Sequence, residues 1–102
     1  MPKRNLNTAI ISVFRFRKLK ENKKYECIKT LAMHEGGHMF GLPSNKRKEN
    51  VEEKLGGHCT NRCVMRQGLI VPDDWVRMTE DRIKYGPLCN QCVNEIYAFF
   101  RE

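Results

Sequence analysis

Hydrophobic and polar residues alternate along the first part of the chain, between Thr8 and Lys18. The two faces would carry Ile11, Val13, Arg15 and Arg17 on one side and Ile10, Ser12, Phe14 and Phe16 on the other. A period of two, with β-branched and aromatic residues, is typical of a β-strand. The segment therefore predicts a strand whose first half is buried on both faces.

A helical pattern follows a charged connection. Asn22 belongs to the residue types that cap helix starts, so we expect a helix from there to about Phe40. Four hydrophobic residues along it would supply core contacts: Ile28, Leu31, Ala32 and Met39. Gly41 ends this helix, because glycine readily adopts the left-handed conformation of a helix terminus.

The remainder of the chain predicts one loop and two further helices. Residues 42–57 begin with turn formers and continue as a charged run that cannot pack into a core, so we expect a mobile loop. A short helix is predicted from Trp75 to Tyr85, with Trp75 and Met78 in the core. A last helix opens at Cys89 and would dock through Val93, Ile96, Tyr97 and Phe100. With 102 residues, these elements indicate one small α+β domain with a marginal core.

The composition indicates the cellular compartment in which the protein is expected. The chain is 40% hydrophobic and 30% charged, and no apolar run approaches the roughly 20 residues needed to cross a membrane. The apolar stretch from Ala9 to Phe14 is too short for a secretory signal and is followed by Arg15 and Arg17. We therefore expect a cytoplasmic protein without a membrane partner.

The net charge of +7 is concentrated in the part of the chain before Cys27. We interpret this basic part as a solvated face, although it could also contact phosphates or draw acidic peptides towards a cleft. Nucleic-acid binding is disfavoured, because aromatic residues are interleaved with basic ones only between Val13 and Arg17.

Residues 30–41 contain the pattern His-Glu-x-x-His, formed by His34, Glu35 and His38. Residues four apart lie on the same face of a helix, so the two imidazoles would converge on one point, which suits zinc. Glu35 would lie beside the pair and accept a proton from water at the metal. The same pattern can also arise by chance or for structural reasons.

Four of the five cysteines form two close pairs, C-x3-C and C-x2-C, at Cys59, Cys63, Cys89 and Cys92. This spacing suits tetrahedral zinc in a reducing compartment, and two disulfides are the alternative. Cys27 is left over, and its place in an apolar helical stretch indicates a small buried residue.

Taken in order, the motifs are His-Glu-x-x-His-x-x-Gly, His-Cys, Cys-x-Met and Cys-x-x-Cys. From roughly Thr8 to Cys92 the chain resembles the archaemetzincin family of metzincin-type zinc metalloproteases. The resemblance implies a Met-turn at Met65, with Glu35 as general base. It also implies two zinc ions, a catalytic one bound by His34, His38 and His58 and a structural one bound by Cys59, Cys63, Cys89 and Cys92.

The chain departs from the family pattern in three ways. Ser44 stands where the family has its third histidine, and His58 arrives only after what looks like an insertion. The third ligand could instead be an acidic residue such as Glu49, Glu52 or Glu53, or water could complete a two-histidine site. The spacings from Cys59 to Cys63 and from Met65 to Cys89 also differ, by loop-sized amounts.

The largest departure is at the amino-terminal side, where one strand stands in place of several and the strand that aligns substrate in the family has no counterpart. We therefore expect a short, amino-terminally reduced, zincin-like domain spanning 1–102. Its parts would be 1–41, the strand and zinc helix; 42–57, the inserted charged loop; and 58–102, with the third ligand, the Met-turn and the structural zinc. A lone strand exposes its backbone edges, so it would pair with a second copy or another chain.

The expected function is zinc-dependent hydrolysis of peptide bonds in a peptide or protein substrate. The alternative is a catalytically inactive, zinc-stapled binding module, with nucleic acid as one conceivable ligand.

Overall fold

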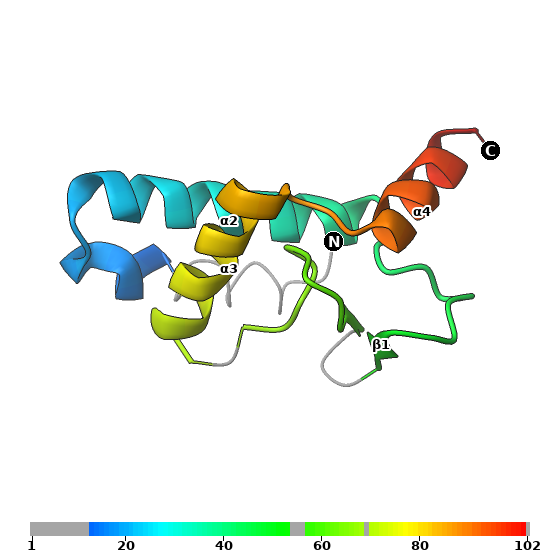
Figure 1. Ribbon diagram of the computed structural model, residues 1–102, viewed down its shortest axis with the longest axis horizontal. Helices are drawn as coiled ribbons and strands as arrows, with labels where there is room; N and C mark the ends of the chain where they lie inside the picture. Colours follow the sequence, from blue (N-terminus) through cyan, green and yellow to red (C-terminus); the bar gives the residue numbers. More distant parts are fainter. Residues whose placement is uncertain (1–12, 54–56, 69, 102) are drawn as a thin grey trace.

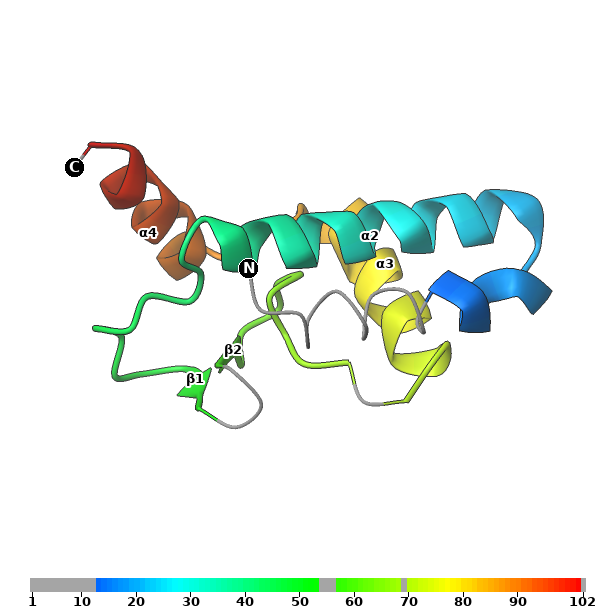
Figure 2. The ribbon, with the colours of Figure 1, turned by 180° about the vertical axis from the view of Figure 1, so that it is seen from behind.

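The computed structural model describes residues 13–53, 57–68 and 70–101. A long helix, α2 (Glu21–Met39), lies along the long axis of the molecule, and α3 (Asp73–Tyr85) crosses it (Figures 1 and 2). A helix at the carboxyl end, α4 (Asn90–Arg101), lies beyond the end of α2 that carries Met39, and two short strands lie below it. The strands β1 (Val51–Glu52) and β2 (His58–Cys59) pair antiparallel, with Val51 opposite Cys59 and Glu52 opposite His58.

The long helix forms where the sequence predicts one, with differences at its start and along its outer face. It begins at Glu21 with Lys20 as N-cap, and no side chain caps it, so the prediction of Asn22 as the cap is wrong. It ends before Gly41, whose φ of 78° is the left-handed conformation expected of a helix terminus. Ala32 and Met39 are exposed rather than in the core, because α3 covers only the opposite side of the helix.

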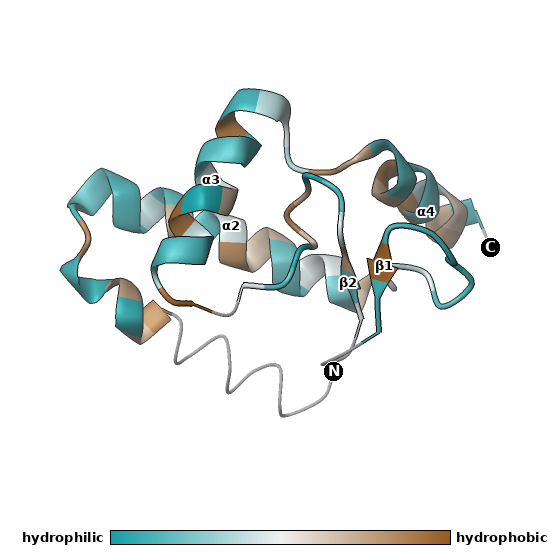
Figure 3. Ribbon diagram, turned by 60° about the horizontal axis from the view of Figure 1, so that its bottom comes forward, coloured by the Kyte–Doolittle hydropathy of each residue, from teal (hydrophilic) through white to brown (hydrophobic). Residues whose placement is uncertain are grey.

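A first hydrophobic cluster lies where α2 and α3 cross (Figure 3). It consists of Phe16, Cys27, Leu31, Trp75 and Met78, which confirms the predicted burial of Cys27, Trp75 and Met78. Beside it, the Thr30 and Thr79 hydroxyls share a hydrogen bond of 2.8 Å. Arg82 on α3 also donates to Thr30 and to the Glu26 carboxylate. The crossing therefore has both apolar and polar contacts.

The strand predicted from Thr8 to Lys18 is wrong in its described part. Residues 13–15 are helical and Phe16–Lys18 form a short 3₁₀ helix, η1, while residues 8–12 lie outside the described residues. Phe16 is fully buried in the first cluster, whereas Val13 and Phe14 are exposed. One buried anchor is enough to dock a helical turn against α2 and α3, and a short apolar run does not distinguish that arrangement from a strand.

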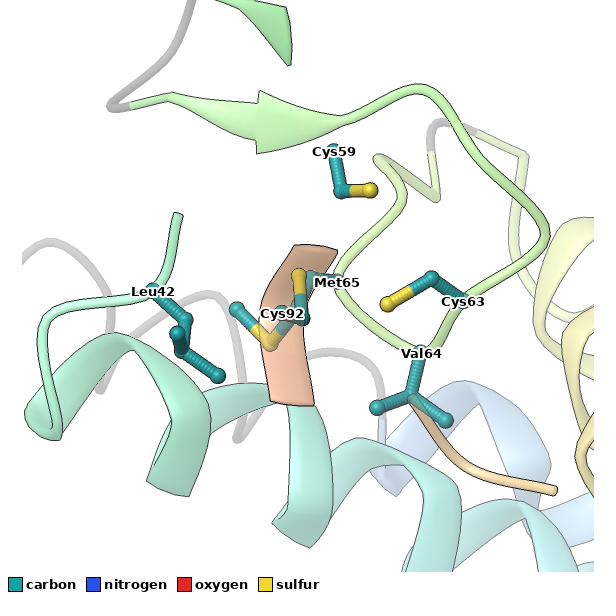
Figure 4. Packing of buried hydrophobic residues seen from close by; sticks show 6 residues of the cluster. All are labelled: Leu42, Cys59, Cys63, Val64, Met65 and Cys92. Atoms are coloured by element: carbon teal, nitrogen blue, oxygen red, sulfur yellow. The ribbon is translucent and has the colours of Figure 1, made fainter. Parts of the chain in front are cut away.

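A second hydrophobic cluster joins the turn after β2 to the end of α2 and the start of α4 (Figure 4). Its buried members are Leu42, Cys59, Cys63, Val64, Met65 and Cys92. In Figure 4 the Val64 side chain points towards α2, while the Cys63 sulfur lies on the side of Cys59 and Cys92. Three of the six residues are cysteines, so this hydrophobic cluster also brings three thiol groups together.

The segment from 42 to 53 is anchored on α4, although its charge predicted a mobile loop. The Arg47 side chain is only 3% exposed and forms an ion pair with Glu95 on α4 at 2.6 Å. The Ser44 backbone N–H also donates to Glu95, and Asn50 donates to Gln91. A charged run can pack when its buried cation meets a carboxylate, which composition alone does not reveal. Residues 54–56 of the predicted loop lie outside the described residues.

The outer face of α4 carries exposed aromatic residues. Tyr97 and Phe100 are 61% and 65% exposed, so the prediction that they dock on the body is wrong, whereas Ile96 packs against the second cluster. Phe99 and Phe100 instead contact each other and Phe40 at the end of α2. Among the described helices, none combines the length and the apolar character that a membrane span requires.

The architecture is thus a mixture of helices and a small two-stranded sheet, compatible with the predicted α+β class. Within residues 58–65, His58, Cys59 and Cys63 are all buried.

Candidate metal centres

Three imidazoles meet beside the carboxyl half of α2. His34 and His38 come from successive turns of the helix, and His58 comes from β2. Their potential ligand atoms all lie within 4.8 Å of one another, and the ring centroids are 4.6 to 5.3 Å apart. The helix spacing predicted the first pair, and the pairing of β2 with β1 brings the third ring to the same point.

Backbone carbonyl groups fix the tautomers of the two helical histidines. The Nδ1 atom of His34 lies 2.6 Å from the Val64 carbonyl oxygen, and the Nδ1 atom of His38 lies 3.0 Å from the Leu42 carbonyl oxygen. A carbonyl oxygen can only accept, so each Nδ1 carries the proton and donates it. Each Nε2 atom therefore presents a lone pair. Metal-binding histidines typically have this second hydrogen bond.

The two Nε2 atoms face each other at 3.1 Å. Two lone pairs at this distance repel each other unless a cation lies between them. A proton is a poor candidate, because burial, followed by the influence of His38 and His58, lowers the pKa of His34 to about 3. Zinc fits better: two Zn–N bonds of about 2.0–2.1 Å at a tetrahedral angle place their nitrogens about 3.3 Å apart.

One aromatic ring contacts a histidine of this group, and a buried methionine packs against the same helix. Trp75 is 3% exposed and its ring meets His34 edge to face, with centroids 5.1 Å apart. Met65 is fully buried and packs against α2 at Gly37, where an added Cβ would overlap the Met65 sulfur. The Met-turn role that the resemblance implies for Met65 stays a prediction, whereas the contact of Trp75 with His34 had no signal in the sequence.

Glu35 follows His34 on α2 and is half-buried. Its Oε2 atom is inaccessible to solvent and, among the described residues, has no hydrogen-bond partner. Burial raises the pKa of this carboxyl above its ordinary value. A buried carboxylate oxygen without a partner is costly, so the group is suited to accepting a proton from a molecule bound nearby.

Four thiols form a second group on the far side of β2. Cys59, Cys63, Cys89 and Cys92 have sulfur atoms within 4.8 Å of one another, and all five cysteines of the chain are free of disulfides. The Cys59 and Cys89 sulfurs are 3.6 Å apart. Four Zn–S bonds of about 2.3 Å in a tetrahedron place the sulfurs about 3.8 Å apart, so the group also fits zinc.

Neighbouring donors point at these sulfurs. The Asn61 backbone N–H donates to Cys59 and its side-chain amide donates to Cys89, each at 3.4 Å. The Cys92 backbone N–H donates to Cys89, and Arg47 donates to the Cys92 sulfur. Such donors stabilise negatively charged sulfur, which is the form that binds metal.

The thiols also influence one another. Hydrogen bonds from Cys63 and Cys92 lower the pKa of Cys59, while the hydrogen bonds of Cys92 with Cys59 and Cys63, followed by burial, raise the pKa of Cys92. In the absence of a cation, the group can therefore hold a first thiolate easily and further thiolates only with difficulty. A divalent cation would remove this restriction.

The structure thus brings all seven predicted ligand residues into two groups, of three histidines and four cysteines. Of the acidic alternatives for the third position, Glu49 and Glu53 are exposed, and Glu52 lies opposite His58 in the sheet without joining the histidine group. Sequence reasoning missed Arg47 and the carbonyl groups of Leu42 and Val64, because none belongs to a recognisable motif.

Comparison with curated proteins shows a similarity to an archaeal protein. Archaemetzincin of Nanoarchaeum equitans (strain Kin4-M) is 35% identical to this chain over 88 residues, which is 86% of this chain. The match covers 36% of the relative, so the chain spans about a third of the length of the protein it matches. No protein-family model and no solved structure matches the chain. Over most of its length, this chain is a homologue of archaemetzincin.

Proposed function

We propose that this chain is a zinc-dependent peptidase of metzincin type, with a catalytic zinc at His34, His38 and His58. The observation that carries the proposal is the pair of Nε2 atoms facing each other at 3.1 Å while both Nδ1 atoms are tied to backbone carbonyl groups. The name of the relative, archaemetzincin, supports the same chemistry. A peptide or protein would be the substrate.

When bound, zinc would polarise the carbonyl of the scissile peptide bond and lower the pKa of a water molecule from about 16 to about 7. Glu35 takes the proton from the attacking water and passes it to the leaving amine. Its raised pKa helps both steps, because a carboxylate with a higher pKa is a stronger base and holds the accepted proton more readily. Trp75 and the Leu42 and Val64 carbonyl groups hold the helical imidazoles in place.

The four cysteines would hold a second zinc with a structural role. It would join β2 and the following turn to α4, from which Cys92 comes. Small domains with limited cores are commonly stabilised in this way. Two zinc ions per chain, one for each group, are therefore part of the proposal.

The test compares wild type with Glu35→Gln and His34→Ala, using a quenched-fluorescence peptide library and zinc analysis by plasma mass spectrometry. Wild type should carry two zinc ions and cleave peptides. Glu35→Gln should keep both ions and lose about 10²–10⁴-fold in turnover, because a general base is removed. His34→Ala should lose the ion of the histidine centre along with the activity. Glu80→Gln, an exposed carboxylate on α3, is the matched control and should behave as wild type.

Two outcomes contradict the proposal. Full activity in Glu35→Gln would show that the mechanism is wrong. A wild-type protein that holds both zinc ions without cleaving any peptide would support the alternative, a catalytically inactive zinc-stapled module.

A further inference from the structure

The segment 42–53, which interrupts the family spacing between the second and third histidines, brings a buried cation to the cysteine centre. The Arg47 side chain is 3% exposed, and its Nη2 atom lies 3.0 Å from the Cys92 sulfur. Burying a guanidinium group is costly unless it is paired. The position of Arg47 is therefore a specific feature of this fold.

Two further contacts fix the orientation of the guanidinium plane. Its Nε atom donates to Glu95 at 2.6 Å, and its Nη1 atom donates to the Asn50 carbonyl oxygen at 3.1 Å. Glu95 is held in turn by the Ser44 backbone N–H at 2.7 Å. Because all three nitrogens of the Arg47 guanidinium group form hydrogen bonds, the group has little freedom to turn away from Cys92.

The charge of the centre explains why a cation is useful there. Zinc with four thiolates has a formal charge of −2, and three of the four sulfurs belong to buried residues. Asn61 and the Cys92 backbone give neutral hydrogen bonds to Cys59 and Cys89. Arg47 gives Cys92 a charge-assisted one, which is roughly twice as strong.

We propose that Arg47 is a positioning residue of the cysteine centre, which stabilises the Cys92 thiolate and thereby retains the bound metal. The inference rests on the proposed function in one respect, that the cysteine group holds zinc. On this view the segment 42–53 is part of the metal centre and not a neutral insertion.

The test uses the full chain loaded with cadmium, whose sulfur-to-metal charge-transfer absorption reports only on thiolate ligands. EDTA is titrated into wild type, Arg47→Met and the control Lys48→Met, an exposed neighbour that undergoes the same change of charge. Arg47→Met should lose cadmium at about 10–100-fold lower EDTA concentration, the usual effect of removing a partner of a metal ligand. Its absorption band should also shift to lower energy, because a sulfur lone pair that accepts no strong hydrogen bond is easier to ionise. Lys48→Met should match wild type in both respects.

Each outcome separates this inference from the proposed function. If wild type shows no charge-transfer band, the cysteine group does not bind metal, and both the inference and the two-zinc proposal fail, whatever the peptidase activity. If wild type shows the band and Arg47→Met behaves as Lys48→Met, the inference alone is overturned. If Arg47→Met loses metal while its band stays in place, Arg47 only docks the segment on α4, and the inference is again overturned. Arg47→Gln, which keeps an uncharged donor, gives the same readouts should Arg47→Met not fold.

Discussion

The Nδ1 atom of His34 lies 2.6 Å from the carbonyl oxygen of Val64, and Val64 directly follows Cys63 in the chain. The two candidate centres are also linked through β2, in which His58 and Cys59 are adjacent residues. The Cys59 backbone N–H also donates to the Met65 carbonyl oxygen at 2.9 Å. The backbone that carries Cys59 and Cys63 thus also carries His58 and orients His34.

We therefore expect Cys63→Ser to weaken the histidine centre as well as the cysteine centre. Without a metal at the thiols, the turn at 63–65 would lose its anchor, and the Val64 carbonyl would hold His34 less firmly. The affinity of the histidine centre for cobalt should fall by about 10-fold or more. Trp75, the single tryptophan of the chain, contacts His34, so quenching of its fluorescence by cobalt measures this affinity.

Cys27→Ser is the control for this experiment. Cys27 is buried in the first cluster, belongs to neither metal group and already accepts a hydrogen bond from Thr79, which a serine can also accept. Its cobalt affinity should equal that of wild type. If Cys63→Ser also binds cobalt as wild type does, the two centres are independent and the shared backbone has no energetic consequence.

Local sequence patterns predicted the candidate metal ligands best where the ligand residues lie close together in the sequence. The spacing of His34 and His38 determined their meeting on one face of α2, and the two cysteine pairs indicated a single thiol group. The family resemblance implied a Met-turn at Met65, and the Met65 side chain is buried against Gly37 on α2. These predictions depend on helix periodicity and on short loops, which vary little between proteins.

The two glycines within the histidine motif allow a test of the packing of Met65. A Cβ at Gly36 would meet nothing within 4 Å, whereas a Cβ at Gly37 would overlap the sulfur of Met65, which is fully buried and has little room to move. Gly36→Ala should raise the free energy of unfolding by about 0.5–1 kcal/mol, the usual gain from replacing a glycine inside a helix. Gly37→Ala should lower it, because Met65 must leave its site.

Urea denaturation of both variants in the zinc-loaded state provides the measurement. A comparable stabilisation in the two variants would mean that Met65 does not pack against α2 as described.

The pair formed by Glu26 and Arg82 predicts a dependence of stability on pH. The hydrogen bond from Arg82 lowers the pKa of Glu26 in the folded state. A lowered carboxyl pKa stabilises the fold above the ordinary pKa of glutamate, and this contribution disappears as the pH falls through the lowered value. Glu26→Gln should therefore be less stable than wild type at pH 7, and the difference should shrink as the solution becomes acidic.

Denaturation by urea from pH 7 to pH 3 checks this expectation, with Glu21→Gln as the control. Glu21 is 94% exposed and pairs with Lys24 on the same helix, so its replacement should change stability little at any pH. A difference between wild type and Glu26→Gln that grows towards acid would contradict the assigned role of Arg82.

The predictions that failed concern residues whose environment is made by distant parts of the chain. Phe16 becomes an anchor of the first cluster only because Trp75 and Met78 arrive from α3, and a strand pattern cannot foresee this. Arg47 is buried because Glu95 and Cys92 lie on α4, far away in sequence. Tyr97 and Phe100 have helical spacing but stay exposed, and the partner that the structure gives Phe100 from outside α4 is Phe40.

A single peptide bond joins the two candidate centres in β2, because His58 belongs to the histidine group and Cys59 to the cysteine group. Successive side chains of a strand point in opposite directions, so this pair sends a nitrogen ligand to one side and a sulfur ligand to the other. Adding or deleting one residue in the strand would exchange the two directions and turn each side chain away from its own ligand group. A change of chain length between Gly57 and Thr60 would therefore remove one ligand from both candidate centres at once.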